Sequence, residues 1–299
     1  MKEKKSQPKP KEPGSAKTAD QRGGANAETY WESKRRKRYA FIQSGGISGK
    51  IFVGIALLSL LCLLLSYGAD VILEGRMIDE GLDIIDPAFL SWNEVTVPTQ
   101  RAYLWYTGFY HLGQMALPII VFLLVRQSLA HNLYLELAAF ALGGLGSEYL
   151  YDMIFYHKPG TFWEEQNVFI TLTILILFLQ ALRFLRPWRK NQKSMVQILA
   201  TALTTALFIF FLLIGNVARF NDTTYIFGLA LALLLMPDHV LMQAASMGIL
   251  GLSRISRSVP AALLFFYNDE EAGSKALVTL PALYILGLLV LYYLVPSLT

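Results

Sequence analysis

Cysteine is nearly absent from this sequence. Cys62 is the only cysteine among 299 residues, and it lies inside the first long apolar run. One thiol can form neither an intramolecular disulfide nor a cluster of metal-binding thiolates. Charged side chains are also sparse, at 16% of residues, against about 25% in an average soluble domain. The sequence therefore excludes a disulfide scaffold and is not typical of a soluble domain.

Basic residues interleaved with aromatic ones, the pattern of a nucleic-acid groove, are also missing. The net charge of +4 comes from the start of the chain, because residues 1–50 hold 13 Lys or Arg and 5 Asp or Glu and so carry +8. The other 249 residues therefore carry −4. We expect no nucleic acid among the partners of this protein.

Long apolar runs are what the sequence has in abundance. Hydrophobic residues make up 54% of the chain, and the mean hydropathy is +0.43. A run of about 20 apolar residues is long enough for a helix to cross about 30 Å of hydrocarbon. Such runs, or shorter apolar runs near them, cover residues 50–73, 102–125, 133–155, 168–185, 195–217, 223–252, 259–267 and 276–295. Residues 223–267 hold one span or two, so the sequence predicts an all-α, polytopic transmembrane helix bundle of seven or eight spans.

Residues 1–49 differ from the predicted transmembrane domain of residues 50–299. The first 29 residues have almost no large apolar groups, which predicts disorder. The basic run at 34–38 favours a cytoplasmic N-terminus. The connection at 74–94 is acidic and the one at 183–193 is basic, which places the first outside and the second inside. Membrane lipid is the expected surrounding partner.

A few polar residues fall within or beside the predicted spans. An ionisable group in hydrocarbon is costly, so each one implies a partner, a water-filled cavity or a function. His111 and Gln114 are three residues apart, and Glu148 and Asp152 are four apart, so each pair is expected on one helix face. The remaining polar positions are Asp70 at the end of the first span, Glu136 at the start of the third, and two dipeptides, Gln166-Asn167 at the start of the fourth span and Asp238-His239 in the interrupted sixth run.

Two interpretations of these residues stay open. In the first, a polar cavity lies between the second, third and fourth spans near the outer leaflet, with His111 as its proton-transfer group. In the second, the polar groups form interhelical hydrogen bonds that hold the bundle together. Both predict that Glu148 and Asp152 face the bundle interior beside Asn167. No metal is expected, since no two histidines share a helical turn.

Three stretches between residues 111 and 172 form an ordered set of motifs: Leu112-Gly113-Gln114-Met115-Ala116-Leu117-Pro118-Ile119, Ser147-Glu148-Tyr149-Leu150-Tyr151-Asp152 and Gln166-Asn167-Val168-Phe169-Ile170-Thr171-Leu172. In order and spacing, these stretches resemble motifs of the TraX family of bacterial membrane proteins. Near the C-terminus, Phe266-Tyr267-Asn268 followed by Gly273 is similar to the family's Tyr-Asn-Gly ending. The whole resemblance covers roughly residues 50–296.

The resemblance implies a multi-pass protein of the bacterial cytoplasmic (inner) membrane, related to membrane acyltransferases. It implies transfer of an acetyl or acyl group from acetyl-CoA, or another acyl-CoA, to an envelope protein or pilin substrate. If the chain is an enzyme, His111 or His239 is the expected proton carrier, with Asp238 beside the latter, because histidine titrates near neutral pH. The expected substrate-binding residues are Gln114, Glu148, Asp152, Gln166 and Asn167.

The sequence departs from the family pattern at the positions expected to do chemistry. The family's Asp-His at the end of the first span is Asp70-Val71 here, and its Gly-Arg is Gly113-Gln114. The Pro-x-His of its last span is also absent, because that region reads Tyr284-Ile285-Leu286-Gly287. Glutamine lacks the charge and the forked donors of arginine. Catalytic activity is therefore left open, with two alternatives: a structural or assembly component of an envelope machine, or a transporter.

Overall fold

The computed structural model describes residues 48–81, 95–155, 167–189, 194–236, 239–267 and 274–298. The tail predicted to be disordered, residues 1–49, lies outside this range apart from its last two residues. Within the range, the long regular elements are all helices. The prediction of an all-α fold is confirmed for this part of the chain.

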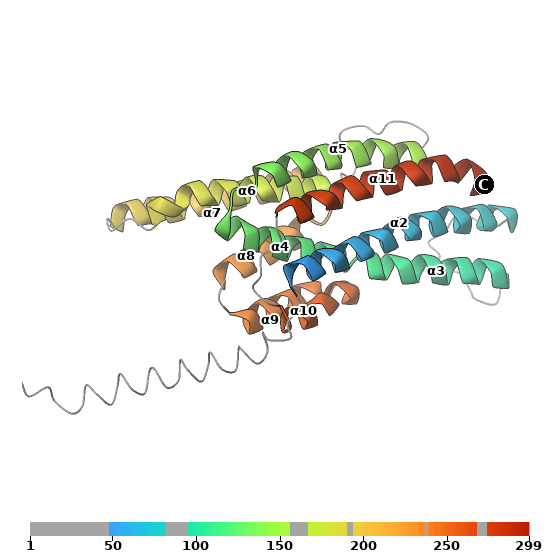
Figure 1. Cartoon of the computed structure of the whole chain (residues 1–299), viewed down its shortest axis with the longest axis horizontal. Coiled ribbons are helices and arrows are strands. Elements are labelled where there is room, and N and C mark those ends of the chain that lie inside the picture. Colours follow the sequence, from blue (N-terminus) through green and yellow to red (C-terminus); the bar gives the residue numbers. More distant parts are fainter. Residues whose placement is uncertain are drawn as a thin grey trace, which may run out of the picture. The chain divides into compact units, whose positions relative to one another are not determined.

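The helices follow one another along the chain (Figure 1). They are α2 (Gly49–Asp79), α3 (Val97–Gly113), α4 (Ala116–Ala130), α5 (Tyr134–Phe155), α6 (Val168–Arg189), α7 (Ser194–Val217), α8 (Thr223–Leu235), α9 (Val240–Gly251), the 3₁₀ helix η2 (Ile255–Arg257), α10 (Val259–Leu264) and α11 (Ser274–Leu298).

Helix α4 forms the centre of the bundle. Every residue from 116 to 125 is buried, and the helix contacts α2, α6 and α8. A helix that is apolar all round is stable where protein neighbours or lipid cover it, and the burial of these residues shows that protein covers this one. The ring of Phe122 packs against those of Phe52 and Tyr267, at centroid distances of 5.9 and 4.9 Å. The core is therefore built around this one helix.

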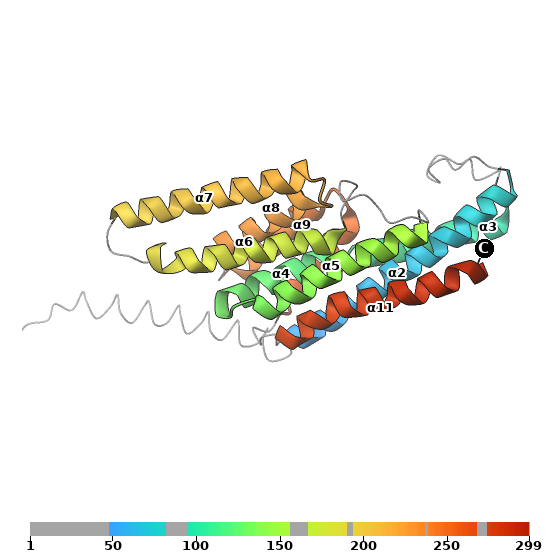
Figure 2. The ribbon, with the colours of Figure 1, turned by 90° about the horizontal axis from the view of Figure 1, so that it is seen from above.

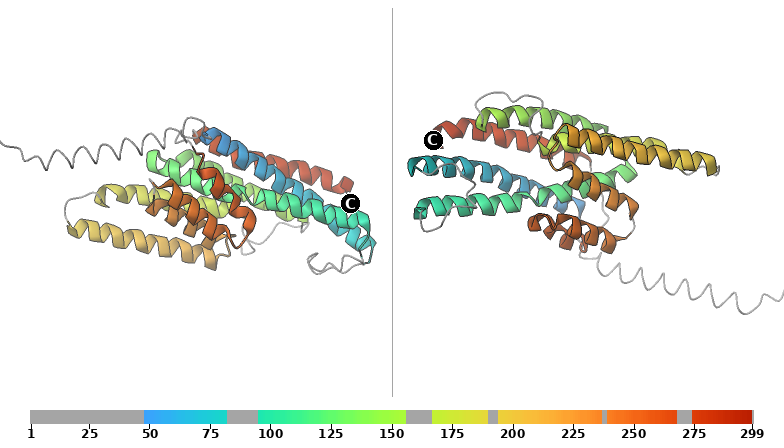
Figure 3. Two further views of the ribbon diagram at one scale, coloured as in Figure 1. Left: turned by 90° about the horizontal axis from the view of Figure 1, so that it is seen from below. Right: turned by 180° about the vertical axis from the view of Figure 1, so that it is seen from behind.

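The other long helices pack around α4 in pairs. Helices α2, α11, α5 and α6 contact one another in that order, α3 pairs with α2, and α7 pairs with α6 (Figure 2). The short helix α8 packs against α4, α9 packs against α8, and α10 packs against α9 (Figure 3). Small residues allow some of these approaches, as is common in membrane bundles. A Cβ on Gly143 of α5, for example, would lie 2.3 Å from Pro281 Cβ of α11.

Five helical segments in the described residues are long and apolar enough to cross a membrane, fewer than the seven or eight predicted. They are Gly49–Asp79, Val97–Ala130, Val168–Trp188, Ser194–Val217 and Ala276–Leu294. Only 11% of the most apolar stretch of Ser194–Val217 is buried by protein. An apolar face of that size suits lipid, so the fold is that of a multi-pass membrane protein.

Two features lower the number of spans. Helix α5 has 22 residues, but Glu136, Glu148 and Asp152 reduce its apolar character. The run at 223–252 does not form one span, because α8 has 13 residues and α9 has 12. Each of these helices is roughly 20 Å long at 1.5 Å per residue, which is shorter than the hydrocarbon layer of about 30 Å.

Candidate binding pocket

A polar cavity of about 730 Å³ lies among the helices. Fourteen of its 23 lining residues are polar, which is unusual in an apolar bundle. Its volume is in the range of small-molecule sites, about 300–1,000 Å³. The polar lining residues are Tyr67, Asp70, Tyr106, Tyr110, Gln114, Glu148, Tyr151, Asp152, Asn167, Arg219, Asn221, Asp222, Arg254 and Tyr284.

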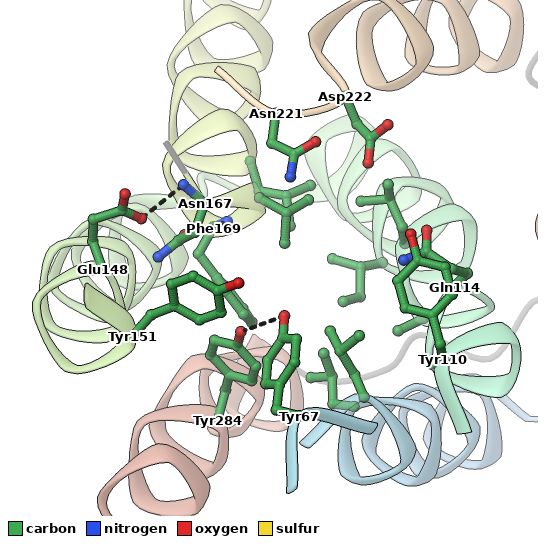
Figure 4. A pocket seen from close by; sticks show the side chains of 18 of the residues that line it. Tyr67, Tyr110, Gln114, Glu148, Tyr151, Asn167, Phe169, Asn221, Asp222 and Tyr284 are labelled. Carbon is green, nitrogen blue, oxygen red and sulfur yellow. Dashed lines mark hydrogen bonds between the residues drawn. The ribbon is translucent and has the colours of Figure 1, made fainter. Parts of the chain in front are cut away.

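Tyrosines from three helices form one wall of the cavity. The hydroxyl of Tyr284 on α11 donates a hydrogen bond of 3.2 Å to the hydroxyl of Tyr67 on α2. The ring of Tyr151 on α5 meets that of Tyr67 edge to face at 5.4 Å. Figure 4 shows the three hydroxyl groups close together at the cavity. Two of these residues are separated by 217 positions in the sequence, so only the packing of α2 against α11 brings them together.

The corner between α5 and α6 places two carboxylates beside an asparagine. The Glu148 carboxylate accepts a 2.8 Å hydrogen bond from the backbone N–H of Asn167. The Asn167 side chain donates to Ser147 Oγ at 2.7 Å and accepts from the N–H of Phe169 at 2.9 Å, which caps the start of α6. Asp152, one turn beyond Glu148, is buried. The prediction that Glu148 and Asp152 face the interior beside Asn167 is confirmed.

Arg257 supports the opposite wall. Its side chain is 2% exposed and donates to both Asp222 carboxylate oxygens, at 2.8 and 2.5 Å. Its Nε also donates to Gln114 Oε1 at 2.9 Å, and its guanidinium lies 4.9 Å from the centre of the Tyr225 ring. A forked, fully bonded pair of this kind can persist away from water. It joins the end of α3 to the α7–α8 turn and to η2.

Two further arginines line the cavity with donors to spare. Arg254 donates from one nitrogen to the Tyr110 hydroxyl at 3.0 Å and to Gln114 Oε1 at 3.2 Å. The Nε and Nη2 atoms of Arg254 form no hydrogen bond with the described residues. Arg219, in the α7–α8 turn, is exposed and has no side-chain partner in the described ranges. The cavity thus has positive groups available on the side formed by these two connections.

Asp70 is the carboxylate of the lining with the fewest contacts. It lies on α2, one turn after Tyr67, and is half-buried. Its side chain forms no hydrogen bond or ion pair with the part of the chain that the structure describes. A carboxylate at this depth is costly unless water, a proton or a ligand meets it. Asp70 is therefore a candidate functional residue, to which the sequence analysis assigned no role.

The structure brings four of the predicted site residues to the cavity, namely Gln114, Glu148, Asp152 and Asn167. Gln166 and Asp238 lie outside the described residues. His111 and His239 are exposed and do not line the cavity. Gln114 keeps a helical backbone and its N–H donates to the Tyr110 carbonyl at 3.0 Å, so the shared face predicted for His111 and Gln114 stays a prediction, although only Gln114 lines the cavity.

Sequence reasoning missed Arg254 and Arg257, which lie 140 and 143 positions from Gln114. One signal was present. The stretch Ser253-Arg254-Ile255-Ser256-Arg257 places two arginines between apolar runs, where a charge needs a partner. The partner itself has no local pattern. In the described part of the chain, no three His, Cys, Asp or Glu side chains are grouped to hold a metal ion.

The fold and the cavity together define a class: a multi-pass membrane protein with a polar pocket inside its helix bundle. Comparison of the chain with protein-family models, with curated proteins and with solved structures found no match. The resemblance to the TraX family therefore stays a prediction.

Proposed function

We propose that this protein binds a polar molecule, or the polar head of an amphiphile, in the cavity between α2, α3, α5, α6 and α11. One observation carries the proposal. The cavity exposes Asp70, a half-buried carboxylate that forms no hydrogen bond with the described residues, and arginine donors at Arg254 and Arg219, whose side chains are exposed. Charged groups within a membrane bundle are costly unless water, a counter-charge or a ligand meets them. A polar ligand would supply those partners.

The ligand reaches the cavity from the outer side in the topology that we propose. The cavity lies where α5 and α6 are joined and where α7 meets α8. At the other end of α6, Arg183 and Arg186 donate to the backbone carbonyls of residues 128–130. Basic residues favour the cytoplasmic side. We place the protein in the bacterial cytoplasmic membrane with its N-terminus inside, which puts the cavity in the outer half.

The test uses the whole protein purified in a mild detergent. Native mass spectrometry of the wild type, incubated with polar lipids and small metabolites extracted from membranes, should detect a bound polar species. The Asp70→Asn and Arg254→Gln variants should lose most of it. Asp79→Asn is the control, because Asp79 is also on α2 but is exposed and outside the cavity lining. Equal occupancy in all four proteins would refute binding in this cavity.

Acyl transfer to the bound molecule is the second candidate. The observation in its favour is a carboxylate next to a cavity that also offers arginine donors. The Asp70 carboxylate would accept the proton of an acceptor hydroxyl or amine as that group attacks the thioester carbon of an acyl-CoA. Arg254 would stabilise the oxyanion, and the CoA thiolate would leave. The base is Asp70, because neither His111 nor His239 lines the cavity.

The cavity suits the acceptor better than the donor. Its lining has four carboxylates and two arginines, and one of those carboxylates is neutralised by Arg257. Several phosphates of a CoA nucleotide would meet more negative than positive charge there. We therefore expect only the acyl end of a donor such as acetyl-CoA to approach the cavity.

Thiol release from acetyl-CoA separates the two candidates. The protein is reconstituted in vesicles with a cell-envelope extract as the acceptor. If acyl transfer is correct, Asp70→Asn lowers the rate by about 100-fold or more, as for loss of a general base. The His111→Ala/His239→Ala double variant keeps its rate. No thiol release by the wild type would reject acyl transfer and leave binding untouched.

A further inference from the structure

The cavity separates its charges. Arg254 is held at one side by Tyr110 and Gln114 from the end of α3. Figure 4 shows Tyr110 and Gln114 on one side of the cavity and Glu148 with Tyr151 on the opposite side. Asp222 does not add to the negative side, because Arg257 neutralises it. Arg254 therefore forms a positive pole near the end of α3, and Glu148 lies across the cavity from the residues that hold it. Arg219, in the α7–α8 turn, is a second positive group of the lining.

Asp70 lies away from the positive pole. A Cβ on Gly113 of α3 would lie 2.8 Å from Leu63 Cα of α2, so these two residues are level with each other. Because α2 and α3 are consecutive antiparallel helices, Asp70, seven residues after Leu63, is level with Tyr106. Arg254 binds Tyr110 and Gln114, four and eight residues further along the chain. At 1.5 Å per residue, the backbone positions of the two residues that bind Arg254 lie roughly 6–12 Å from the level of Asp70 along the helix axis.

Tyrosine rings accompany the negative pole. Tyr67 precedes Asp70 by three residues and so lies on the same face of α2. Tyr106 lines the cavity at the level of Asp70, and its ring stacks on that of Tyr110 at 5.9 Å. Aromatic faces attract ammonium ions, and a carboxylate among them adds a direct ion pair. The negative pole thus suits an ammonium group, and the guanidinium of Arg254 suits a phosphate.

We propose that the cavity binds a zwitterion in which an ammonium group and a phosphate are joined by a short chain, as in phosphoethanolamine. The phosphate lies at Arg254, and the ammonium group lies at Asp70 among the tyrosines. In an α-amino acid a single carbon separates the two charges, which is too short for the spacing of Asp70 and Arg254. This inference names the ligand class of the pocket and rests on the proposed binding function. The same chemistry occurs in a free metabolite and in a lipid headgroup.

The experiment measures ligand-induced stabilisation of the full chain in detergent. Free phosphoethanolamine is compared with ethanolamine, inorganic phosphate, glycerol 3-phosphate and glucose. Phosphoethanolamine should bind at least tenfold more tightly than any of the other four. In a second arm, the protein is placed in nanodiscs that contain phosphatidylethanolamine or phosphatidylglycerol, and the retained lipid is identified by native mass spectrometry. Binding in the first arm indicates a free ligand, and selective retention in the second alone indicates a headgroup.

Variants of Asp70 and Arg254 test which residue binds the ammonium group and which binds the phosphate. In Asp70→Asn, phosphoethanolamine and glycerol 3-phosphate should bind equally well, because the preference for the ammonium group is lost. In Arg254→Gln, the preference for a phosphate is lost, and Arg254→Lys restores it only in part, since lysine lacks the fork. Asp79→Asn keeps the wild-type selectivity. A melting temperature within a few degrees of the wild type, measured without ligand, establishes that each variant is folded.

Failure of the zwitterion assignment and failure of the proposed binding function give different results. If glucose binds as tightly as phosphoethanolamine, and neither lipid is preferred, the zwitterion assignment is overturned and the pocket remains a polar binding site. If the charged ligands bind but Asp70→Asn and Arg254→Gln do not alter their order, the assignment of the poles is wrong. If no compound binds in either arm, and membrane extracts also give no bound species, the proposed function fails as well.

Discussion

At the scale of single residues, the buried pair of Arg257 and Asp222 should be the most sensitive to substitution. The Arg257 side chain is 2% exposed, and that of Asp222 is 17% exposed. Replacing Arg257 by Gln leaves a buried carboxylate without its cation, which costs about 3–5 kcal/mol of unfolding free energy. The stability of Arg257→Lys should lie between that of the wild type and that of Arg257→Gln, because lysine keeps the charge but lacks the forked donors of arginine. Denaturant unfolding of the solubilised protein measures the change.

Arg219 provides the matched control for that prediction. It is an exposed arginine with no side-chain partner in the described part of the chain, so Arg219→Gln should change stability by less than about 0.5 kcal/mol. The Arg257→Gln/Asp222→Asn double variant should recover part of the loss, because it removes both charges. Equal losses for Arg219→Gln and Arg257→Gln would mean that the ion pair does not stabilise the fold.

Gly113 is the second residue for which the structure makes a sharp prediction. A Cβ at this position would lie 2.8 Å from both Cα and Cβ of Leu63, and backbone cannot easily move away. Gly113→Ala should therefore destabilise the protein by about 1–3 kcal/mol and weaken ligand binding, since α2 and α3 form a wall of the cavity.

On the same helix, a Cβ at Gly108 would meet nothing within 4 Å. Gly108→Ala should be neutral or stabilising by up to about 1 kcal/mol. Melting temperatures that fall equally in both variants would contradict the close approach.

At the scale of the elements, a polar clasp joins the end of α2 to the start of α3. The Glu80 carboxylate accepts hydrogen bonds from the backbone N–H and hydroxyl of Thr96, and from the hydroxyl of Thr99 at 2.5 Å. These bonds, those of Thr96 first, lower the pKa of Glu80 from its ordinary value of 4.5. They favour the ionised carboxylate, which exists in this form at neutral pH.

The clasp predicts a pH dependence with a definite sign. Because the folded-state pKa of Glu80 is lowered, its contribution to stability is present above pH 4.5 and is lost as the pH falls through the lowered pKa. The melting temperature of the wild type should therefore fall more steeply on acidification below pH 4.5 than that of Glu80→Gln, which has no proton to gain. Thr99→Val should give a slope between those of the wild type and Glu80→Gln, because the hydrogen bonds from Thr96 to Glu80 remain. Parallel curves for the three proteins would exclude a role for the clasp.

The helices were predictable from the sequence, and their interruptions were not. Apolar runs and loop charge located α2, α6, α7 and α11, because a span needs about 20 apolar residues whatever its neighbours are. The run at 223–252 gave no such information, since α8 and α9 are short helices whose ends are set by packing against α4 and each other. Length alone could not distinguish a broken span from a continuous one.

Local sequence patterns also limited the prediction of the cavity residues. Glu148, Asp152 and Asn167 were predicted together because helical spacing and a short connection make their neighbourhood local. The contact of Arg257 with Gln114, and that of Tyr284 with Tyr67, join segments 143 and 217 residues apart. No periodicity encodes such pairs. His111 is a different case, because its side chain is exposed although Gln114, three residues further on, lines the cavity.

At the scale of the whole molecule, helix length bears on the depth of the cavity. Helix α2 has 31 residues, so it is about 46 Å long, and it exceeds the hydrocarbon layer of about 30 Å. It must tilt or extend beyond the membrane at one end. The clasp at Glu80 and the half-buried Asp70 lie toward its C-terminal end. An extension at that end would bring Asp70 and its part of the cavity close to the headgroup layer, where a zwitterionic headgroup is available.

The orientation of the chain decides which side supplies the ligand, and it can be tested independently of binding. The connection at 74–94 is acidic and that at 183–193 is basic, so we expect the first outside and the second inside. Single cysteines are introduced as Asp83→Cys and Gln192→Cys in a Cys62→Ser background, which is otherwise free of thiols. A membrane-impermeant maleimide should label Asp83→Cys in intact cells and label Gln192→Cys only after permeabilisation. The reverse pattern would place the cavity on the cytoplasmic side, within direct reach of acyl-CoA, and would favour a cytoplasmic ligand over one from the outer leaflet.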